Sequence, residues 1–276
     1  LFSPSDIQRI VKKAIVENLK QTYHQEWFTE DGAEYPLRIS ILKNVVTVGL
    51  DSTGTSLHKR GYRKYTAPAP VTETLAAALL LLSPWKKDRI LVDPFCGSGT
   101  ILIEAAMIAM NIAPGMNREF TAEGWTNLIP KKEWYSVVEE ASDLMEEEAE
   151  VNIQGYDIDG EVLKMARANA ALAGVDKQIH FQQRDIINFS SPKKYGFVIS
   201  NPPYGERLSS KKEMELLYRT IGNIIRENET WSFFLLSGFE EAQKAIGKKA
   251  TKNRKIYNGM MKTYLYQYMG TKPPRH

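Results

Sequence analysis

The sequence predicts an α/β protein built on a doubly wound parallel sheet, and three observations support this fold class. Short β-rich runs alternate with helical segments over residues 89–238. Polar motifs follow directly after several of these runs, where ligands bind in such sheets. Near the end of the chain, Asn258-Gly259 lies between two β-rich runs, which predicts an antiparallel hairpin added to the sheet.

A smaller α+β region precedes the sheet. Residues 5–20 have the apolar periodicity of an amphipathic helix, and Ser5 and Gln8 have the spacing of a capping box at its start. Residues 37–51 alternate apolar and polar side chains around a Lys-Asn pair, which predicts a hairpin. A basic, turn-rich connector follows this hairpin and separates it from the predicted sheet.

We place the domain boundary in that connector, with a first domain at residues 1–60 and a second at residues 61–276. The second domain contains every predicted strand of the parallel sheet. We expect strands at 89–93, 153–159, 179–185, 195–200 and 231–238, helices at 75–82, 100–110, 161–174 and 213–228, and a hairpin at 256–269.

Composition narrows the class of protein. The 276 residues are 43% hydrophobic and 25% charged, which suits one large domain or one and a half. No apolar run approaches the ~18 residues that span a membrane and no signal peptide is visible, so we expect a soluble cytoplasmic protein without a membrane partner. A single cysteine excludes an internal disulfide. Because the chain begins at Leu1, we expect it to be a piece of a longer protein.

The first polar motif is DPFCGSGT at residues 93–100, between a predicted strand and a predicted helix. Gly97 and Gly99 let the backbone approach a ligand closely, and the start of the helix offers free N–H groups. A plain tight turn would use the same residues, and many dinucleotide-binding folds share the pattern. The motif lacks the lysine of a P-loop, so we expect no ATP chemistry.

Two more carboxylates follow the next two strands. Asp157, in YDID, can accept hydrogen bonds from ribose hydroxyls, whereas Asp159 suits the N-cap of the following helix. Asp185 taken alone could be an ordinary surface residue. Together with Asp93, however, these strand ends suit adenosine, which offers two ribose hydroxyls and an exocyclic amine. The insertion at 111–150 separates Asp157 widely from the glycines, which disfavours a nicotinamide-dependent oxidoreductase.

The most specific motif is NPPY at residues 201–204, which ends a β-branched apolar run. Two successive prolines make this corner rigid. The Asn201 amide oxygen and the Pro202 carbonyl can accept the two hydrogens of an amino group, while Tyr204 can stack on a base. Such acceptors turn the nitrogen lone pair toward an electrophile. The motif therefore predicts methyl transfer to the exocyclic amine of an unstacked base, with a purely structural corner as the alternative.

In this order, DPFCGSGT, YDID, QRD and NPPYGERL resemble the S-adenosylmethionine-dependent amino-methyltransferases, which have a Rossmann-like fold. More narrowly, RGYRKY, DPFCGSGTILIEAA, NIAPGMNREF and NPPYGERL together resemble the bacterial 23S rRNA guanine-N2 methyltransferase family, whose members carry a THUMP RNA-binding domain. Such sequences are often labelled N6-adenine-specific DNA methylases because of NPPY. The resemblance covers residues 58–270, and residues 1–57 resemble the carboxyl-terminal part of a THUMP module.

The resemblance implies roles for individual residues. The target amine would be held by Asn201 and the Pro202 carbonyl, and the implied catalytic residues are Asn201, Pro202, Pro203 and Tyr204. The cofactor would be S-adenosylmethionine, with S-adenosylhomocysteine as the product. Asp157 would hold the ribose, Ile158 would pack on adenine, and Asp185 would accept from its amino group. The implied cofactor-binding set is Thr66, Ala67, Pro68, Asp93, Pro94, Phe95, Cys96, Gly97, Ser98, Gly99, Thr100, Asp157, Ile158, Asp185, Ile186 and Asn201.

Two other groups of residues need an interpretation. Cys96 lies inside the glycine turn, where a small buried side chain is favoured over a catalytic thiolate, and the four histidines show no metal-ligand spacing. No acidic residue occurs at positions 242–276, a usual sign of a polyanion site. The candidate phosphate contacts, each of which could also be a solvated surface charge, are Lys43, Lys59, Arg60, Arg63, Lys64, Lys248, Lys249, Lys252, Arg254 and Lys255.

Together these observations predict an S-adenosylmethionine-dependent enzyme that methylates guanine N2 in 23S ribosomal RNA, with ribosomal RNA as its partner and no metal. The alternatives are N6-adenine methylation of DNA, guanine-N2 methylation of tRNA, and a non-catalytic RNA-binding protein with a vestigial cofactor fold. The THUMP-like region favours RNA over DNA, and the intact motifs argue against a vestigial fold.

Overall fold

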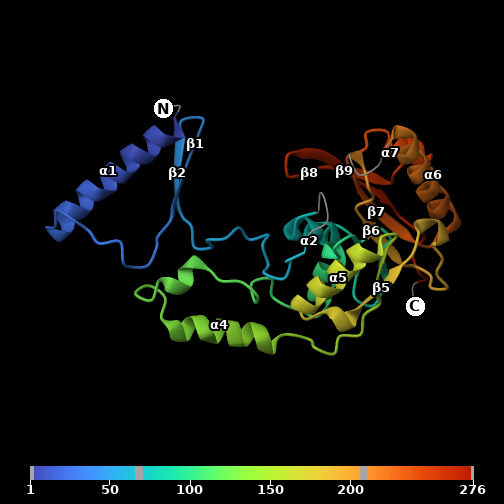
Figure 1. Ribbon diagram of the computed structural model, residues 1–276, viewed down its shortest axis with the longest axis horizontal. Helices are drawn as coiled ribbons and strands as arrows, with labels where there is room; N and C mark the ends of the chain where they lie inside the picture. The colour runs from blue at the N-terminus through green and yellow to red at the C-terminus, as the bar shows by residue number, and fades with distance from the viewer. Residues whose placement is uncertain (1–2, 66–70, 206–209, 275–276) are drawn as a thin grey trace.

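The computed structural model describes residues 3–65, 71–205 and 210–274. It is elongated, with α1 and a two-stranded sheet at one end and a seven-stranded sheet at the other (Figure 1). The helix α4 (Lys131–Asp143) lies along one side of the molecule, in the segment that connects α3 (Thr100–Ala109) to β4 (Ile153–Asp157).

The N-terminal region consists of α1 (Pro4–Tyr23) and the antiparallel pair β1 (Leu37–Leu42) and β2 (Val45–Leu50). The predicted hairpin is confirmed, and its two turn residues both have positive φ angles, as the tight turn requires. The predicted capping box is wrong. The helix begins earlier because Ser3 accepts from the N–H of Asp6 and Pro4 suits the first helical turn.

This region buries little of its apolar surface. The helix α1 contains no buried residue, and every residue of β1 and β2 is exposed or half-buried. The apolar stripe of α1 faces β1 across an open groove, lined on one side by Ile7 and Val11 and on the other by Leu37 and Ile39. The predicted stripe therefore exists, but the structure does not enclose it.

The large sheet has the strand order β5-β4-β3-β6-β7-β9-β8. Its first five strands are parallel, whereas β9 is antiparallel to both of its neighbours. The predicted doubly wound sheet with an antiparallel C-terminal hairpin is therefore confirmed. The strands are β3 (Leu91–Asp93), β4 (Ile153–Asp157), β5 (Ile179–Gln183), β6 (Phe197–Ser200), β7 (Ser232–Ser237), β8 (Lys252–Asn258) and β9 (Met261–Tyr268).

Helices cover both faces of this sheet, and two hydrophobic cores result. On one face α2 (Glu73–Leu81), α3 and α5 (Gly160–Leu172) pack on apolar side chains of the sheet. On the other face α6 (Lys211–Glu227) and α7 (Ala242–Ile246) do the same. Strands buried on both faces read as continuous apolar runs, which is why FVIS and SFFLLS could be recognised in the sequence.

Three short 3-10 helices complete the secondary structure of the described residues: η1 (Thr121–Gly124), η2 (Asp176–Gln178) and η3 (Ile186–Asn188). None of the helices in the described ranges is long and apolar enough to cross a bilayer.

Candidate active site

Three acidic residues lie where β3, β4 and β5 end, at the same edge of the sheet. The register pairs Asp93 with Gly155 and Asp157 with Gln183, so the carboxylates lie progressively further along the strand direction. Asp185 follows the end of β5 by two residues. The predicted grouping of Asp93, Asp157 and Asp185 at one edge is what this topology produces, because parallel strands all end on the same side.

The glycine turn is bound to the neighbouring strand β4 by two hydrogen bonds. The Gly97 N–H donates to the Asp157 carboxylate at 3.0 Å, and the Cys96 N–H donates to the Tyr156 carbonyl at 2.9 Å. Gly99 has a φ of 85°, and a Cβ there would lie only 3.2 Å from the Cβ of Ala166 in α5. Glycine is therefore required both by the backbone angle and by the close approach of α5.

Gly99 is also the N-cap of α3, and it offers no side chain to the first turn of that helix. No side chain caps the first N–H groups of α3, which begin at Thr100. This end of the helix therefore favours a negatively charged or polar group of a ligand. Ser98 and Thr100 are both buried within the turn. Pro94 and Phe95 lead into it, with the Phe95 N–H donating to Asp93 at 3.0 Å.

Asp93 links the glycine turn to the NPPY corner. Its carboxyl group is almost completely buried and forms a hydrogen bond with the Ser200 hydroxyl, one residue before Asn201. Burial, with a smaller contribution from the negative charge of Asp157, raises the pKa of Asp93 to about 7, although hydrogen bonds from Ser200 and Phe95 act in the opposite direction. Asp93 thus connects the ends of β3 and β6 through a buried hydrogen bond.

Two isoleucines lie exposed beside the carboxylates of β4 and β5. Ile158 is 67% exposed and Ile187 is 70% exposed, and both follow an acidic strand end by one or two residues. Ile186, a predicted cofactor residue, instead packs its side chain in the core. Ile187, which the sequence prediction did not include, is the exposed member of this pair, and nothing in the sequence indicates which of the two side chains points outward.

The neighbouring carboxylates have separate local roles. Asp159 caps α5 by accepting from the N–H of Glu161 at 2.8 Å, as its position suggested. Asp157 accepts from the N–H of Asp159 through one oxygen and from Gly97 through the other. Asp185 accepts from the N–H of Ile187 at 3.0 Å, which orients the exposed Ile187.

The NPPY corner follows β6 and is largely buried. Asn201 is 7% exposed, and its amide oxygen Oδ1 accepts no hydrogen bond from any described residue. Tyr204 packs in the core against Gly238, where an added Cβ would lie 2.9 Å from the ring. Because Tyr204 is only 8% exposed, little of its ring is open to a base in this structure. Stacking of Tyr204 on the target base remains a prediction. Pro202 is buried and Pro203 half-buried.

The three predicted cofactor residues Thr66, Ala67 and Pro68 lie outside the described residues. The segments on either side of them are firmly held. Arg63 forms an ion pair with Glu73 at 3.0 Å and donates to the Val71 carbonyl at 2.8 Å. On the other side, the Asn169 side chain binds the backbone of Tyr65. Asn169 was missed by sequence reasoning, because a buried asparagine inside a helical run carries no signal of its own.

Two predicted phosphate contacts are wrong. Arg60 is buried and lies 3.6 Å from Glu104, and Arg63 is paired with Glu73 as described above. Both guanidinium groups neutralise interior carboxylates, so neither is open to a polyanion. The other eight candidates are exposed: Lys43, Lys59, Lys64, Lys248, Lys249, Lys252, Arg254 and Lys255.

Cys96 is buried, and burial raises the pKa of its thiol well above the usual value. A buried neutral thiol is a packing residue, which agrees with the favoured interpretation of this cysteine. Within the described parts of the chain, no cluster of His, Cys, Asp or Glu has the arrangement of a metal site.

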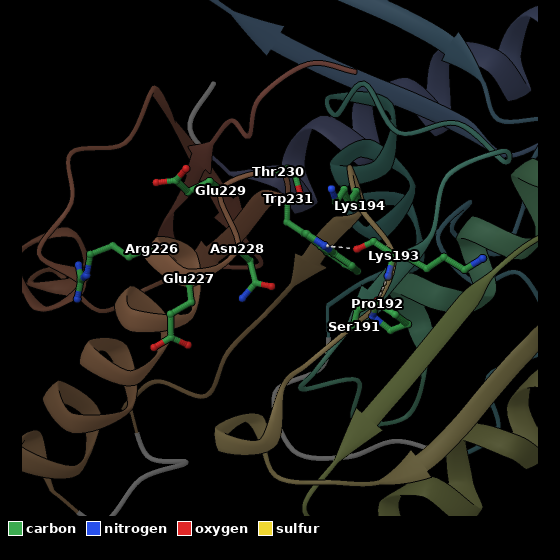
Figure 2. Close-up of a pocket in the computed structure, with 10 residues that line it drawn as sticks. All are labelled: Ser191, Pro192, Lys193, Lys194, Arg226, Glu227, Asn228, Glu229, Thr230 and Trp231. Carbon is green, nitrogen blue, oxygen red and sulfur yellow. Dashed lines mark hydrogen bonds between the residues drawn. The ribbon is translucent and has the colours of Figure 1, made fainter. Parts of the chain in front are cut away.

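A separate hollow lies at the opposite edge of the sheet, where β6 and β7 begin (Figure 2). It is lined by residues 191–194 and 226–231, and the Trp231 indole donates to the Lys193 carbonyl at 3.0 Å. None of the predicted site residues lines this hollow. The candidate active site is therefore the carboxyl edge, where the four sequence motifs meet.

A doubly wound sheet with a glycine turn after β3, carboxylates after β4 and β5, NPPY after β6 and an antiparallel β8–β9 hairpin defines an S-adenosylmethionine-dependent methyltransferase. The chain belongs to the RMKL-like methyltransferase domain family, whose model matches residues 60–267. A THUMP domain model matches residues 1–51.

Curated relatives agree with this assignment. YpsC of Bacillus subtilis (strain 168), provisionally named as an RNA methyltransferase, is 46% identical over 277 residues, which is 100% of this chain and 72% of that protein. The ribosomal RNA large subunit methyltransferase K/L of Shewanella pealeana is 38% identical over 259 residues, 91% of this chain. The chain spans only 36% of the length of that K/L protein.

Solved structures agree as well. A possible methylase from Clostridium difficile 630 is 50% identical with a TM-score of 0.95, covering 100% of this chain and 73% of that one. SMU.472, provisionally a methyltransferase and solved with S-adenosylhomocysteine, is 42% identical with a TM-score of 0.93, covering 99% and 72%. A protein from Listeria monocytogenes described as a predicted N6-adenine-specific DNA methylase is 46% identical with a TM-score of 0.91, covering 98% and 70%. The predicted family is therefore confirmed.

Proposed function

We propose that this protein methylates the exocyclic amine of a nucleobase in RNA, with N2 of a guanine in 23S ribosomal RNA as the target. The observation that carries the proposal is the Asn201 amide oxygen, which is buried at the end of β6 and accepts no hydrogen bond from a described residue. An unpaired buried acceptor costs about 1–3 kcal/mol, so a position that retains one invites a donor from a ligand.

The residues at the carboxyl edge fit S-adenosylmethionine. The uncapped start of α3 offers N–H groups to its methionine end, whereas the N–H groups of Gly97 and Gly99 are already donated within the protein. Asp157 would accept from the ribose hydroxyls in addition to the N–H groups of Gly97 and Asp159. The exposed side chain of Ile158 would give adenine an apolar surface, and Asp185, two residues after the end of β5, would accept from its amino group. When bound, this cofactor supplies an electrophilic methyl group.

The proposed role of the NPPY corner is to hold the target amine. Asn201 Oδ1 and the Pro202 carbonyl accept its two hydrogens, which directs the nitrogen lone pair away from both acceptors. The preceding residue, Ser200, donates a hydrogen bond to the buried Asp93, and this bond helps to fix the position of Asn201. Holding the nucleophile in a near-attack position can supply much of the rate enhancement, so a strong general base is not required.

The substrate class rests on the N-terminal region and on the relatives. A THUMP model matches residues 1–51, and the curated relatives above are named as RNA methyltransferases. The choice of guanine N2 rests on the resemblance carried by NIAPGMNREF and NPPYGERL. The name of the Listeria relative makes N6-adenine in DNA the second candidate.

The test uses the protein with methyl-labelled cofactor and three unmodified substrates: ribosomal RNA, tRNA and DNA. Nucleoside mass spectrometry then identifies the labelled base. Label in N2-methylguanosine from 23S RNA is expected, and Asn201→Ala assayed in parallel should give none. Label confined to N6-methyladenine in DNA would overturn the proposal, and label confined to tRNA would replace its ribosomal target.

A further inference from the structure

The β8–β9 hairpin carries two lysines and two tyrosines in alternation on one of its faces. The register pairs Lys255 with Tyr264 and Tyr257 with Lys262, and residues paired directly lie on the same face of a sheet. The Lys255 ammonium lies 5.1 Å from the centroid of the Tyr257 ring, and that of Lys262 lies 5.4 Å from the Tyr264 ring. We call these four residues the Lys-Tyr face.

The opposite side of the hairpin is anchored in the core. Thr263 and Leu265 are completely buried, and Ile256 packs on the same core. On the Lys-Tyr face, in contrast, Lys255 and Lys262 are exposed and Tyr257 is 58% exposed. The hairpin thus holds Lys255, Lys262 and Tyr257 toward solvent, whereas Tyr264 is half-buried and packs against the second core.

The free end of the hairpin lies beside the NPPY corner. Tyr264 pairs with Ser237 at the end of β7, so the residues before Tyr264 extend past the edge where β6 also ends. A Cβ added to Gly238 would meet the Tyr204 ring at 2.9 Å and the Met261 sulfur at 3.3 Å. Tyr204 and the start of β9 are therefore neighbours across Gly238. Figure 1 shows the hairpin, in red, reaching out from the sheet.

The charged residues of the segment that carries this face are all of one sign. The sequence has no acidic residue at positions 242–276; Lys248 and Lys249 are exposed just before the hairpin, and Lys252 and Arg254 are exposed within β8. The seven carboxylates of residues 139–150 belong to α4 and the segment after it, on the other side of the molecule (Figure 1). A polyanion is thus attracted to the hairpin side and repelled from the α4 side.

Cations next to aromatic rings, repeated along a surface, are what single-stranded nucleic acids bind: the cations contact phosphates and the rings stack on bases. We infer that the Lys-Tyr face binds the single-stranded RNA that flanks the target base, and so delivers that base to the NPPY corner. The inference rests on the proposed function and assigns its substrate-binding surface. Tyr257 is the stacking residue, and Lys255 and Lys262 are the phosphate contacts.

The test measures binding of the protein to a fluorescein-labelled, unstructured 12-nucleotide RNA by anisotropy at several salt concentrations, without cofactor. Tyr257→Ala should weaken binding about tenfold, since stacking contributes ~1–3 kcal/mol, while Tyr257→Phe should bind like the parent protein. The double variant Lys255→Ala/Lys262→Ala should reduce the slope of log K against log salt by about 1.4, at ~0.7 per phosphate contact in a single strand.

The matched control is Lys131→Ala/Lys132→Ala at the exposed start of α4, which removes the same charge far from the hairpin. It should leave both affinity and slope unchanged. Equal weakening by this control, or unchanged binding by Tyr257→Ala, would overturn the inference. Tighter binding of single-stranded DNA of the same sequence would also overturn it, in favour of DNA.

Failure of this inference is distinguishable from failure of the proposed function. The binding assay needs no turnover, so it reads the hairpin alone, whereas mass spectrometry reads the modified base. Affinity for S-adenosylhomocysteine, measured by calorimetry, should be the same in all the hairpin variants. Unaltered thermal unfolding of Tyr257→Ala is also expected, because most of this ring is already exposed.

Discussion

The side chain of Asn169 binds the backbone of Tyr65 at both its N–H and its carbonyl. The Asn169 Oδ1 accepts from the Tyr65 N–H at 3.2 Å, and Nδ2 donates to the Tyr65 carbonyl at 2.9 Å. The same Nδ2 donates to the Ser98 carbonyl at 3.2 Å. One fully buried amide in α5 thus joins the glycine turn to the segment that leads into Thr66, Ala67 and Pro68.

Replacing Asn169 should therefore affect both stability and cofactor binding. Asn169→Ala removes three hydrogen bonds and leaves backbone groups unpaired, so we expect the free energy of unfolding to fall by about 3 kcal/mol, at ~1 kcal/mol each. Affinity for S-adenosylhomocysteine should fall as well. Urea unfolding and calorimetry measure the two effects. The control is Asn223→Ala, which removes a surface hydrogen bond to Arg226; unchanged cofactor affinity in Asn169→Ala would exclude a positioning role.

Asp157 and Asp159 lie two residues apart but should respond differently to substitution. Asp157→Ala should weaken S-adenosylhomocysteine binding about tenfold or more, because hydrogen bonds to a charged group contribute about 1.5–3 kcal/mol. Asp159→Ala loses an N-cap, so we expect about 1 kcal/mol less stability with little change in affinity. Calorimetry and urea unfolding of both variants test this. Equal affinities of the two would remove the ribose assignment of Asp157.

Asn201 should affect methyl transfer far more than cofactor binding. Asn201→Ala removes the acceptor oxygen, and we expect transfer to be abolished while S-adenosylhomocysteine affinity stays within a few-fold of the parent. Asn201→Asp keeps an acceptor oxygen at the same place and should retain part of the activity. Single-turnover assays with labelled cofactor measure both variants. Wild-type turnover by Asn201→Ala would exclude the proposed role.

The raised pKa of Asp93 predicts that the free energy of unfolding depends on pH. Burial raises its pKa to about 7, so the folded state favours the neutral carboxyl, and the stabilisation is present below the unfolded pKa and lost as pH rises through 7. From pH 5 to pH 8 this corresponds to about 2–3 kcal/mol, at 1.36 kcal/mol per pKa unit. Asp93→Asn keeps the shape without the charge, so its unfolding free energy should fall less over this range. Parallel curves for the two proteins would contradict the assignment.

Much of the fold was predictable because its signals are local. Continuous apolar runs mark the buried parallel strands, and Lys43-Asn44 marks a turn in which both residues have positive φ angles. Asn258-Gly259 also marks a hairpin, but Asn258 is the last residue of β8, and the turn itself consists of Gly259, with a φ of 61°, and Met260. The strand β8 was only partly predicted, since it begins at Lys252 rather than at residue 256. Its first residues are charged because it is an edge strand, and charge hides the alternation of a strand.

The candidate site was likewise predictable only where its signals are local in the sequence. Strand-end carboxylates and NPPY are short motifs, so their grouping at one edge follows from the topology alone. The partners of Arg60 and Arg63 are distant in the sequence, and nothing near these arginines indicates that Glu104 and Glu73 neutralise them. Asn169 was missed for the same reason, because Tyr65 and Ser98 approach it only in the folded chain.

Arg118, in the NIAPGMNREF motif, gathers the carbonyls of the connector between the two predicted domains. Its guanidinium donates to Thr53 at 2.9 Å and to Ser56 at 3.0 Å, and it also contacts the carbonyls of Thr55 and Lys59. The Phe120 ring lies below it, with its centroid 4.6 Å from the guanidinium carbon. This motif therefore has a structural explanation, since the hydrogen bonds of Arg118 hold the connector in one conformation.

Arg118→Lys should loosen the connector while keeping the charge, because an ammonium cannot reproduce the planar fork of donors. We expect trypsin to cleave faster after the exposed Lys59, while S-adenosylhomocysteine affinity stays unchanged, since these contacts of Arg118 are all in the connector. Timed digestion with mass spectrometry measures the cleavage site. Arg9→Lys on α1, where the arginine pairs only with nearby Asp6 among the contacts described, is the control and should be digested like the parent. Cleavage of Arg118→Lys at the parental rate would show that the connector is held without the guanidinium fork.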